Sequence, residues 1–503
     1  MSEKRRLAPY FLACALLLSN CTWAIGQSDE LAAKSQQGRE AMSAGKYKEA
    51  ISIYQELIKA LPGDAGLRMN LGIAHYMAGQ YRDSIRHLEA AVKANPELAQ
   101  AFLFLGASEH RLGNPVRAIP SLQRYVRKDG KDPRGRQLLG DSLFAVERFE
   151  QAAEQFEALS KLEAENPKAW HGLGRSYEAL AGRAFERLEK IAPESAYWLA
   201  LVADTRAVQQ QYRSAFFFYR KALEKQPKMR GIHMALSQIY RRTGHAEWAT
   251  QEEEKEAQLG LPDCTSEKVV CDFVAGRFRE ALDAVKNKQT PESYYWRSQS
   301  YNALALDALS RLAKLPPSFE MHEVMAEIHR NQGRHLESVN EWKKALEISP
   351  GNPTARKELA VSLILTHDYD AAKPLVDSLL TEEPNSAQLN YLAGDILLNQ
   401  QRPGEAVPLL KKAVEYDPAF PPAHSSLGRA FLTLGEAAKA IPHLKSALVL
   451  DHDGSLLYQL AQAYRSTGER ELAGQMLQKY QEIQKTLQLE REQLEKEATI
   501  TPP

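Results

Sequence analysis

The sequence predicts an all-α fold, an α-solenoid of about 14 stacked helix–turn–helix units, two of which have fused long helices. The first observation behind this prediction is a fixed step of 34 residues between glycines, in the series Gly45, Gly79 and Gly113 and in the series Gly38, Gly72, Gly106 and Gly140. The second is the return of the same step far downstream, in Gly394 and Gly428 and in Ala406 and Ala440. Unrelated amphipathic helices would give no reason for a constant step, so the chain is predicted to be built from repeats.

Residues 65–98 show how one unit works. Small residues such as Gly72 and Ala91 let neighbouring helices approach to about 8–10 Å. Gly79 can adopt the left-handed conformation that ends the first helix, and Pro96 stops the second because proline cannot continue the hydrogen-bond ladder. A single hairpin cannot bury its apolar face alone, so stacked neighbours must share one core.

The pattern of one unit resembles that of the tetratricopeptide repeat family, as seen in Leu71-Gly72, Gly79, Tyr81, Ala91 and Pro96. The resemblance covers most of residues 31–486. The resemblance implies antiparallel helix pairs stacked into a superhelix that binds a protein or peptide partner. It also implies that the first helix of each repeat lines a concave groove.

Composition excludes several classes of function. Lys and Arg together number 64 and so do Asp and Glu, so the chain lacks the positive field that attracts nucleic acid. The basic stretch 124–136 is interrupted by Asp129 and Asp132 and is interpreted as a solvated loop. No nucleic-acid partner is predicted.

The sequence contains no complete motif of a known catalytic site. His322-Glu323 imitates the start of a zinc-protease motif, but the second histidine is missing and His329 follows too late along the helix to share a metal. No phosphate-binding loop and no nucleophile motif occurs. We therefore predict a protein that is not an enzyme, with no catalytic residue, no metal and no cofactor.

The N-terminus predicts export to the periplasm or the extracellular space. Residues 1–26 form a candidate signal peptide, with Lys4, Arg5 and Arg6 before the apolar run Leu7–Leu18. Leu18-Ser19-Asn20-Cys21 is also similar to a lipoprotein signal, which would make Cys21 a lipidation site and the protein membrane-anchored. A membrane association is predicted only in that second case.

The repeat marks divide the mature chain into blocks. In chain order these are an N-terminal repeat block at 31–166, a shortened unit at 167–195, a middle block at 196–290, a second shortened unit at 291–318, a C-terminal block at 319–486, a polar capping helix at 475–498 and a disordered tail at 499–503.

The two shortened units have the same deletion and similar sequences, so they are interpreted as two copies of one structural element. The interval from Tyr177 to Ala181, like that from Tyr301 to Ala305, is four residues, whereas the corresponding interval in an ordinary unit is nine. The five missing residues are those that make the turn, so the first helix should run straight into the second. We predict continuous helices near 168–191 and 293–314, each a stiff strut that interrupts the groove.

Cys264 and Cys271 are the cysteines that remain after removal of the signal peptide. In an oxidising compartment they form a candidate disulfide, provided that Cys264 folds back from its loop. Two separately packed thiols are the alternative.

The resemblance assigns the groove to positions 5, 9 and 12 of the first helices. Carried onto the second, third and fourth repeats, these positions give Met69, Ile73, Tyr76, Leu103, Ala107, His110, Gln137, Asp141 and Phe144. The family's carboxylate clamp is not predicted, because Ser35 and Arg39 stand where it has Lys and Asn. Packing of Met69 and Leu103 against neighbouring repeats is the alternative to a partner surface.

The functional hypothesis is an exported, non-enzymatic scaffold that binds a protein or peptide through this groove. The alternative hypothesis is a lipid-anchored accessory factor for envelope assembly or for polysaccharide or protein export.

Overall fold

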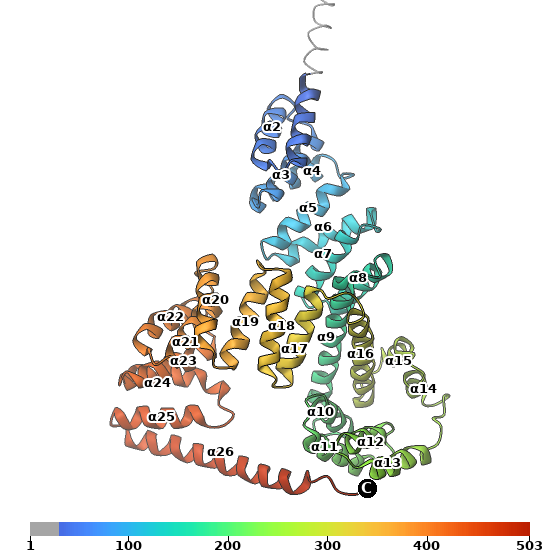
Figure 1. Cartoon of the computed structure of the whole chain (residues 1–503), viewed down its shortest axis with the longest axis vertical. Coiled ribbons are helices and arrows are strands. Elements are labelled where there is room, and N and C mark those ends of the chain that lie inside the picture. The colour runs from blue at the N-terminus through green and yellow to red at the C-terminus, as the bar shows by residue number, and fades with distance from the viewer. Residues whose placement is uncertain (1–29) are drawn as a thin grey trace, which may run out of the picture. The chain divides into compact units, whose positions relative to one another are not determined.

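The computed structural model describes residues 30–503, which fold into helices joined by short turns, with no β-strand among them (Figure 1). The candidate signal peptide and Cys21 lie outside the described residues. The chain divides into two compact units, the first made of Met1–Leu180 with Ala305–Leu309 and the second of Ala181–Leu304 with Ser310–Pro503.

The first unit begins with antiparallel hairpins. A helix at 30–43 precedes the others, which are α2 (Tyr47–Ala60), α3 (Ala65–Met77), α4 (Tyr81–Ala94), α5 (Ala99–Arg111), α6 (Pro115–Lys128), α7 (Pro133–Ala145) and α8 (Phe149–Leu162). Each pair corresponds to one 34-residue period of the sequence, as the predicted solenoid requires.

The second unit contains two further runs of hairpins, separated by a second long helix. After a long helix come α10 (Ala196–Val208), α11 (Tyr212–Lys225), α12 (Ile232–Arg242), α13 (Ala246–Gln258), α14 (Lys268–Val274) and α15 (Phe278–Val285). Beyond a second long helix come α17 (Phe319–Asn331), α18 (His335–Ile348), α19 (Pro353–Leu365), α20 (Tyr369–Glu382), α21 (Ala387–Asn399), α22 (Pro403–Tyr416), α23 (Pro421–Thr433), α24 (Ala437–Ala447), the 3₁₀ turn η1 (Leu448–Leu450), α25 (Ser455–Ser466) and α26 (Arg470–Glu497).

Glycine has two separate duties in a hairpin. Gly79 takes a φ of 75° and ends α3, a left-handed conformation that costs glycine nothing. Gly72 instead allows close approach, since a Cβ there would lie 2.6 Å from Leu88 Cγ. The fourth hairpin makes its turn without glycine, because Glu147 itself adopts a φ of 60°.

A side-chain hydrogen bond that sequence reasoning missed ties the start of many first helices to the loop before them. The fourth residue of the unit donates to the carbonyl six residues earlier. The pairs are Arg68 with Pro62, Arg136 with Gly130, Trp170 with Ala164, Asn390 with Pro384 and His424 with Pro418. The accepting carbonyl lies two residues past the last residue of the preceding second helix, so the bond fixes the loop between two units.

The two predicted fused helices are confirmed. α9 runs from Pro167 to Ile191 over 25 residues, and α16 runs from Pro291 to Leu312 over 22 residues, each without a reversal of direction. Because the turn residues are missing, the first helix of each shortened unit continues directly into the second.

The copies also make matching contacts within each unit. In the first unit, a Cβ on Gly174 would lie 3.8 Å from the carbonyl oxygen of Ala305. In the second unit, Ser298 Oγ donates to the carbonyl oxygen of Ala181 over 3.3 Å. Ser298 follows Gly174 by 124 residues and Ala305 follows Ala181 by the same 124, so the second contact is the counterpart of the first.

Cys264 and Cys271 are joined in a disulfide, with their Cα atoms 5.6 Å apart. Seven residues of helix would separate two Cα atoms by about 10 Å, too far for a disulfide. The bond forms because Cys264 lies in the loop before α14, which begins only at Lys268.

The end of the chain differs from the predicted disordered tail at 499–503. The polar capping helix predicted at 475–498 corresponds to most of α26, and the residues after it pack on the second unit. Tyr240 Oη donates to the carbonyl oxygen of Thr501 over 2.7 Å, and Ile500 packs against the core around α11 and α12. The tail is ordered because its apolar side chain and a backbone carbonyl find partners far back in the sequence.

Candidate functional site

The predicted groove residues lie on the first helices of three successive hairpins. Met69, Ile73 and Tyr76 are on α3, Leu103 and His110 on α5, and Asp141 and Phe144 on α7. Spacings of three and four residues bring them to one face of each helix.

Burial separates these residues into two groups. Leu103 is 3% exposed, so it contributes packing. Met69 and Ile73 are partly exposed, although both pack against the small core around Leu88 and Leu105. Tyr76, His110, Asp141 and Phe144 are partly exposed as well. Contact with a partner is therefore open to every member of the set except Leu103.

Aromatic rings are the main feature of the exposed group. The Tyr76 ring lies edge-on to Phe104 with centroids 5.2 Å apart and also contacts Tyr81 at 5.6 Å. The Arg175 guanidinium lies 4.7 Å from the centroid of Phe144. We use the name inner row for the residues of this surface, which are Tyr76, Phe104, His110, Asp141, Phe144 and Arg175.

Phe104 and Arg175 were not predicted from the sequence. Phe104 is at position 6 of its unit, whereas Arg175 is at position 9 of the shortened unit. The signal for Phe104 was an aromatic residue between two predicted lining residues, Leu103 and Ala107. Arg175 belongs to the shortened unit, and the groove positions were carried only onto the second, third and fourth repeats.

The inner row carries two charged side chains of opposite sign, Asp141 and Arg175, together with a histidine. His110 Nδ1 lies 3.0 Å from Ser142 Oγ, and burial lowers the pKa of His110, so its ring is neutral at pH 7. Aromatic rings with a neutral imidazole form a surface suited to apolar and aromatic side chains.

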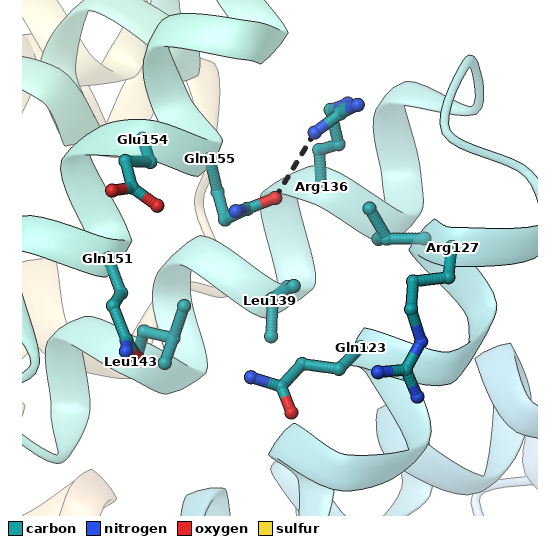
Figure 2. Close-up of a pocket in the computed structure, with 9 residues that line it drawn as sticks. Gln123, Arg127, Arg136, Leu139, Leu143, Gln151, Glu154 and Gln155 are labelled. Carbon is teal, nitrogen blue, oxygen red and sulfur yellow. Dashed lines mark hydrogen bonds between the residues drawn. The ribbon is translucent and has the colours of Figure 1, made fainter.

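A recess of about 330 Å³ opens between α6, α7 and α8 (Figure 2). Leu139 and Leu143 of α7 form its apolar lining, and Arg136 donates to Gln155 at its edge over 3.2 Å. The other residues that line it are Gln123, Val126, Arg127, Gln151 and Glu154. We call it the outer recess, since it uses positions 7 and 11 of α7, whereas the predicted groove uses positions 5, 9 and 12.

The outer recess was not predicted. Neither Leu139 nor Leu143 was singled out from the sequence, and both are buried. Only the three-dimensional arrangement shows that the two second helices on either side leave a hollow above them.

A polar cluster links α10, α11 and α16 inside the second unit. Tyr219 Oη donates to Asp204 Oδ1 over 2.5 Å, and Gln299 Nε2 donates to Asp204 Oδ2 over 2.6 Å. Burial raises the pKa of Asp204. Both carboxylate oxygens are engaged, so the cluster fastens the three helices together.

Of the two histidines singled out from the sequence, His322 makes an internal contact with a glutamate. His322 Nδ1 lies 2.6 Å from Glu341 Oε2, across the α17–α18 hairpin. Within residues 30–503, no group of three or more His, Cys, Asp or Glu side chains is arranged to hold a metal ion. In the same part of the chain, every helix is too short or too polar to span a bilayer.

Comparison with curated proteins finds partial relatives. The chain is 25% identical over 188 residues to chicken (Gallus gallus) DnaJ homolog subfamily C member 3, covering 33% of this chain and 37% of that protein. It is 25% identical over 190 residues to mouse (Mus musculus) aspartyl/asparaginyl beta-hydroxylase, covering 33% of this chain and 25% of that protein. The match thus spans about a third or less of each relative's length.

Solved structures give similar local matches. A crystal structure of MamA is 20% identical, covering 40% of this chain and 94% of that one, with a TM-score of 0.29. YrrB, described as a TPR protein with an unusual peptide-binding site, is 20% identical, covering 41% and 92%, with a TM-score of 0.29. These scores reflect short stretches of shared repeats and carry no functional argument.

Family models described as tetratricopeptide repeat match most of the chain. The matched residues are 41–103, 78–133, 138–184, 330–396, 391–455 and 454–486. They cover most of the hairpins of the first unit, part of α9, and the hairpins from the end of α17 to the first part of α26. The chain therefore belongs to the tetratricopeptide repeat family.

Proposed function

We propose that this protein is an exported, non-enzymatic scaffold that binds a protein or peptide segment along the inner row. The observation that carries the proposal is the partly exposed aromatic surface of Tyr76, Phe104 and Phe144, repeated over three successive hairpins. Membership of the tetratricopeptide repeat family supports a role as a protein-interaction scaffold.

The chemistry of the inner row defines the partner segment. Tyrosine and phenylalanine supply large apolar contact area at low cost in side-chain entropy, and such residues dominate binding energy in interfaces. The neutral His110 does not repel a cation or attract an anion. The expected partner segment has apolar or aromatic side chains spaced to contact successive hairpins, as an amphipathic helix or an extended strand would have.

Export is supported by two independent features. The N-terminal residues Lys4–Arg6 and Leu7–Leu18 have the pattern of a signal peptide. The Cys264–Cys271 disulfide is a bond that persists in oxidising compartments.

The second candidate function is that of a lipid-anchored accessory factor for envelope assembly or export. The motif Leu18-Ser19-Asn20-Cys21 favours it. Intact mass measurement of the purified mature protein distinguishes the two, since lipidation adds acyl mass at Cys21 and a Cys21→Ser variant would lose both that mass and the membrane association.

The test of the inner row compares capture by three variants of the mature protein. Tyr76→Ala and Phe144→Ala should each lose a partner that the wild type retains, whereas Met77→Ala should retain it. Met77 is the matched control because it is 43% exposed and adjoins Tyr76 in the sequence but lies outside the inner row.

The captured partner is then titrated against the same variants. Tyr76→Ala should weaken binding by about 2 kcal/mol if the ring is an anchor, with a much smaller change in thermal stability. Equal losses of affinity and stability would show that Tyr76 is a core residue, and the proposal would fail.

A further inference from the structure

The last residues of the chain lie on a built surface of the second unit. Tyr240 Oη donates to the Thr501 carbonyl oxygen over 2.7 Å, and Arg220 Nη1 donates to Thr501 Oγ1 over 3.3 Å. Ile500 packs against the core around α11 and α12, and Ala498 is only 3% exposed. The second unit therefore contacts the Thr501 carbonyl, the Thr501 hydroxyl and the apolar side chain of Ile500.

Rigid aromatic packing positions the donors of this surface. The Tyr240 ring is 1% exposed and lies edge-on between Phe216 and Trp248, with centroids 5.7 Å from each. The Arg220 guanidinium lies 5.8 Å from the centroid of Phe216. We call this surface, made of Phe216, Arg220 and Tyr240, the seat.

The seat occupies the same register of the repeat as the outer recess. Arg220 on α11 and Tyr240 on α12 are 20 residues apart, as are Gln123 on α6 and Leu143 on α7. The outer recess at that register is a hollow of about 330 Å³. The outer recess is an open hollow at this register, and at the seat residues 498–503 cover the corresponding surface.

The segment that fills the seat is separate from the repeat hairpins. It follows α26, whose second half is rich in Glu, Gln and Lys and whose Leu489 is 56% exposed. α26 is tied to its own hairpin near its middle, where Tyr480 contacts Tyr458 at 5.3 Å and Gln484 donates to the Asp453 carbonyl over 2.7 Å. Pro502 and Pro503 keep the end extended, since proline does not continue a helix.

We propose that the seat is a second peptide-binding site, which takes an extended segment carrying an apolar residue followed by threonine, and that residues 498–503 occupy it in cis as an autoinhibitory segment. Tethering gives the chain's own segment a high effective concentration, so a partner segment must displace it. The proposal is independent of the inner row, which lies in the first unit.

The test uses the full chain and a fluorescently labelled peptide with the sequence of residues 496–503. The variant Ile500→Asp places a charge in the apolar part of the seat and should release the segment, because a carboxylate resists transfer from water. We expect the peptide to bind the Ile500→Asp chain at least about tenfold more tightly than the wild-type chain. Leu489→Asp, which adds the same charge at an exposed position of α26, should bind the peptide as weakly as the wild type.

Variants of the seat locate the binding. In the Ile500→Asp chain, a further Tyr240→Phe change removes one donor and should weaken peptide binding about fivefold. Arg220→Ala should weaken it as well, whereas Arg213→Ala, which removes an exposed arginine from the same helix, should leave it unchanged.

Three outcomes would overturn the proposal. The first is that the Ile500→Asp chain keeps its thermal midpoint and fails to bind the peptide. The second is a fall in thermal midpoint without peptide binding, which would make the segment part of the core. The third is a wild-type chain that sediments as a dimer and dissociates on Ile500→Asp, which would place the segment in the seat of a second copy.

Discussion

The hairpin α7–α8 and the continuous helix α9 begin alike and continue differently. Both start with proline, at Pro133 and Pro167, and both have Leu-Gly at positions 7 and 8. After position 11, the hairpin turns at Glu147, whereas α9 runs on to Ile191. Two stretches with the same opening therefore adopt opposite courses.

Residue type at the turn does not account for the difference. Glu147 has no special freedom, yet it adopts a φ of 60° and the chain reverses. Gly182 has that freedom, yet it lies within a continuous helix. What differs is the number of residues between the two helices, since five are missing from the shortened unit. Spacing decides whether the turn forms, and the residue at the turn only adjusts its cost.

The largest expected effect comes from proline. Ala181→Pro places proline within α9, where its ring clashes with the preceding turn and one hydrogen bond is lost, so unfolding should become easier by about 3 kcal/mol or more. The matched control is Glu154→Pro in α8, because four sister helices already hold proline at that register, at Pro120, Pro374, Pro408 and Pro442. Urea unfolding midpoints of the two variants measure the difference. Equal losses would mean that α9 is no more sensitive than an ordinary second helix.

The next largest effect is expected from acid, which should destabilise α9 but not α7 through the residue at position 5. Burial, with Arg175 nearby, lowers the pKa of His171 in α9 to about 3 from its ordinary 6.5, whereas α7 has Gln137 at the same position. The neutral ring contributes stability that is fully present above pH 6.5 and is lost as the pH falls towards 3. At pH 4.5 the loss should reach about 2–3 kcal/mol.

The variant His171→Gln makes α9 resemble α7 at this position and removes that titration. The stability of the variant relative to the wild type should rise between pH 7 and pH 4.5, as measured by urea unfolding at each pH. The value at pH 7 is the baseline for the cost of the substitution itself. A difference that stays constant with pH would contradict the role of His171.

The same comparison explains which features a sequence can predict. The solenoid and the fused helices follow from spacing, which is local and periodic, so both were predicted correctly. The fate of residues 499–503 depends on Tyr240, which is 261 residues away from Thr501, and no local pattern carries that information. The outer recess was missed for a related reason, because Leu139 and Leu143 have the same pattern whether the space above them is filled or open.

The inner row was predicted from the sequence only in part. The repeat register assigned Tyr76, His110 and Phe144 to the first helices of their units, and the structure has them on α3, α5 and α7. Register alone did not distinguish the buried Leu103 from the partly exposed Phe144, because burial depends on the side chains of the next hairpin. The binding role of the row stays a prediction.

Glycine substitutions should produce smaller effects of opposite sign. Gly182→Ala should stabilise the protein by about 1 kcal/mol, since alanine is the better helix former and nothing lies within 4 Å of the new Cβ. Gly79→Ala should destabilise it by about 1 kcal/mol, because the φ of 75° disfavours any side chain. Thermal midpoints of the two variants provide the measurement. A stabilising Gly79→Ala would show that the hairpin turn can relax to another conformation.

The smallest effect is expected where the hairpin lacks its glycine. Glu147→Gly removes the strain of a left-handed residue, which costs about 1–2 kcal/mol, but it also gives the unfolded chain more freedom. The net gain should be about 0.5–1 kcal/mol, and Gln401→Gly, at a φ of 61° in the α21–α22 hairpin, should gain a similar amount. Glu150→Gly, in the regular first turn of α8, is the control and should lose stability, because glycine there has no strain to relieve. Thermal midpoints that fall for both Glu147→Gly and Gln401→Gly would show that residue type, and not spacing alone, maintains these turns.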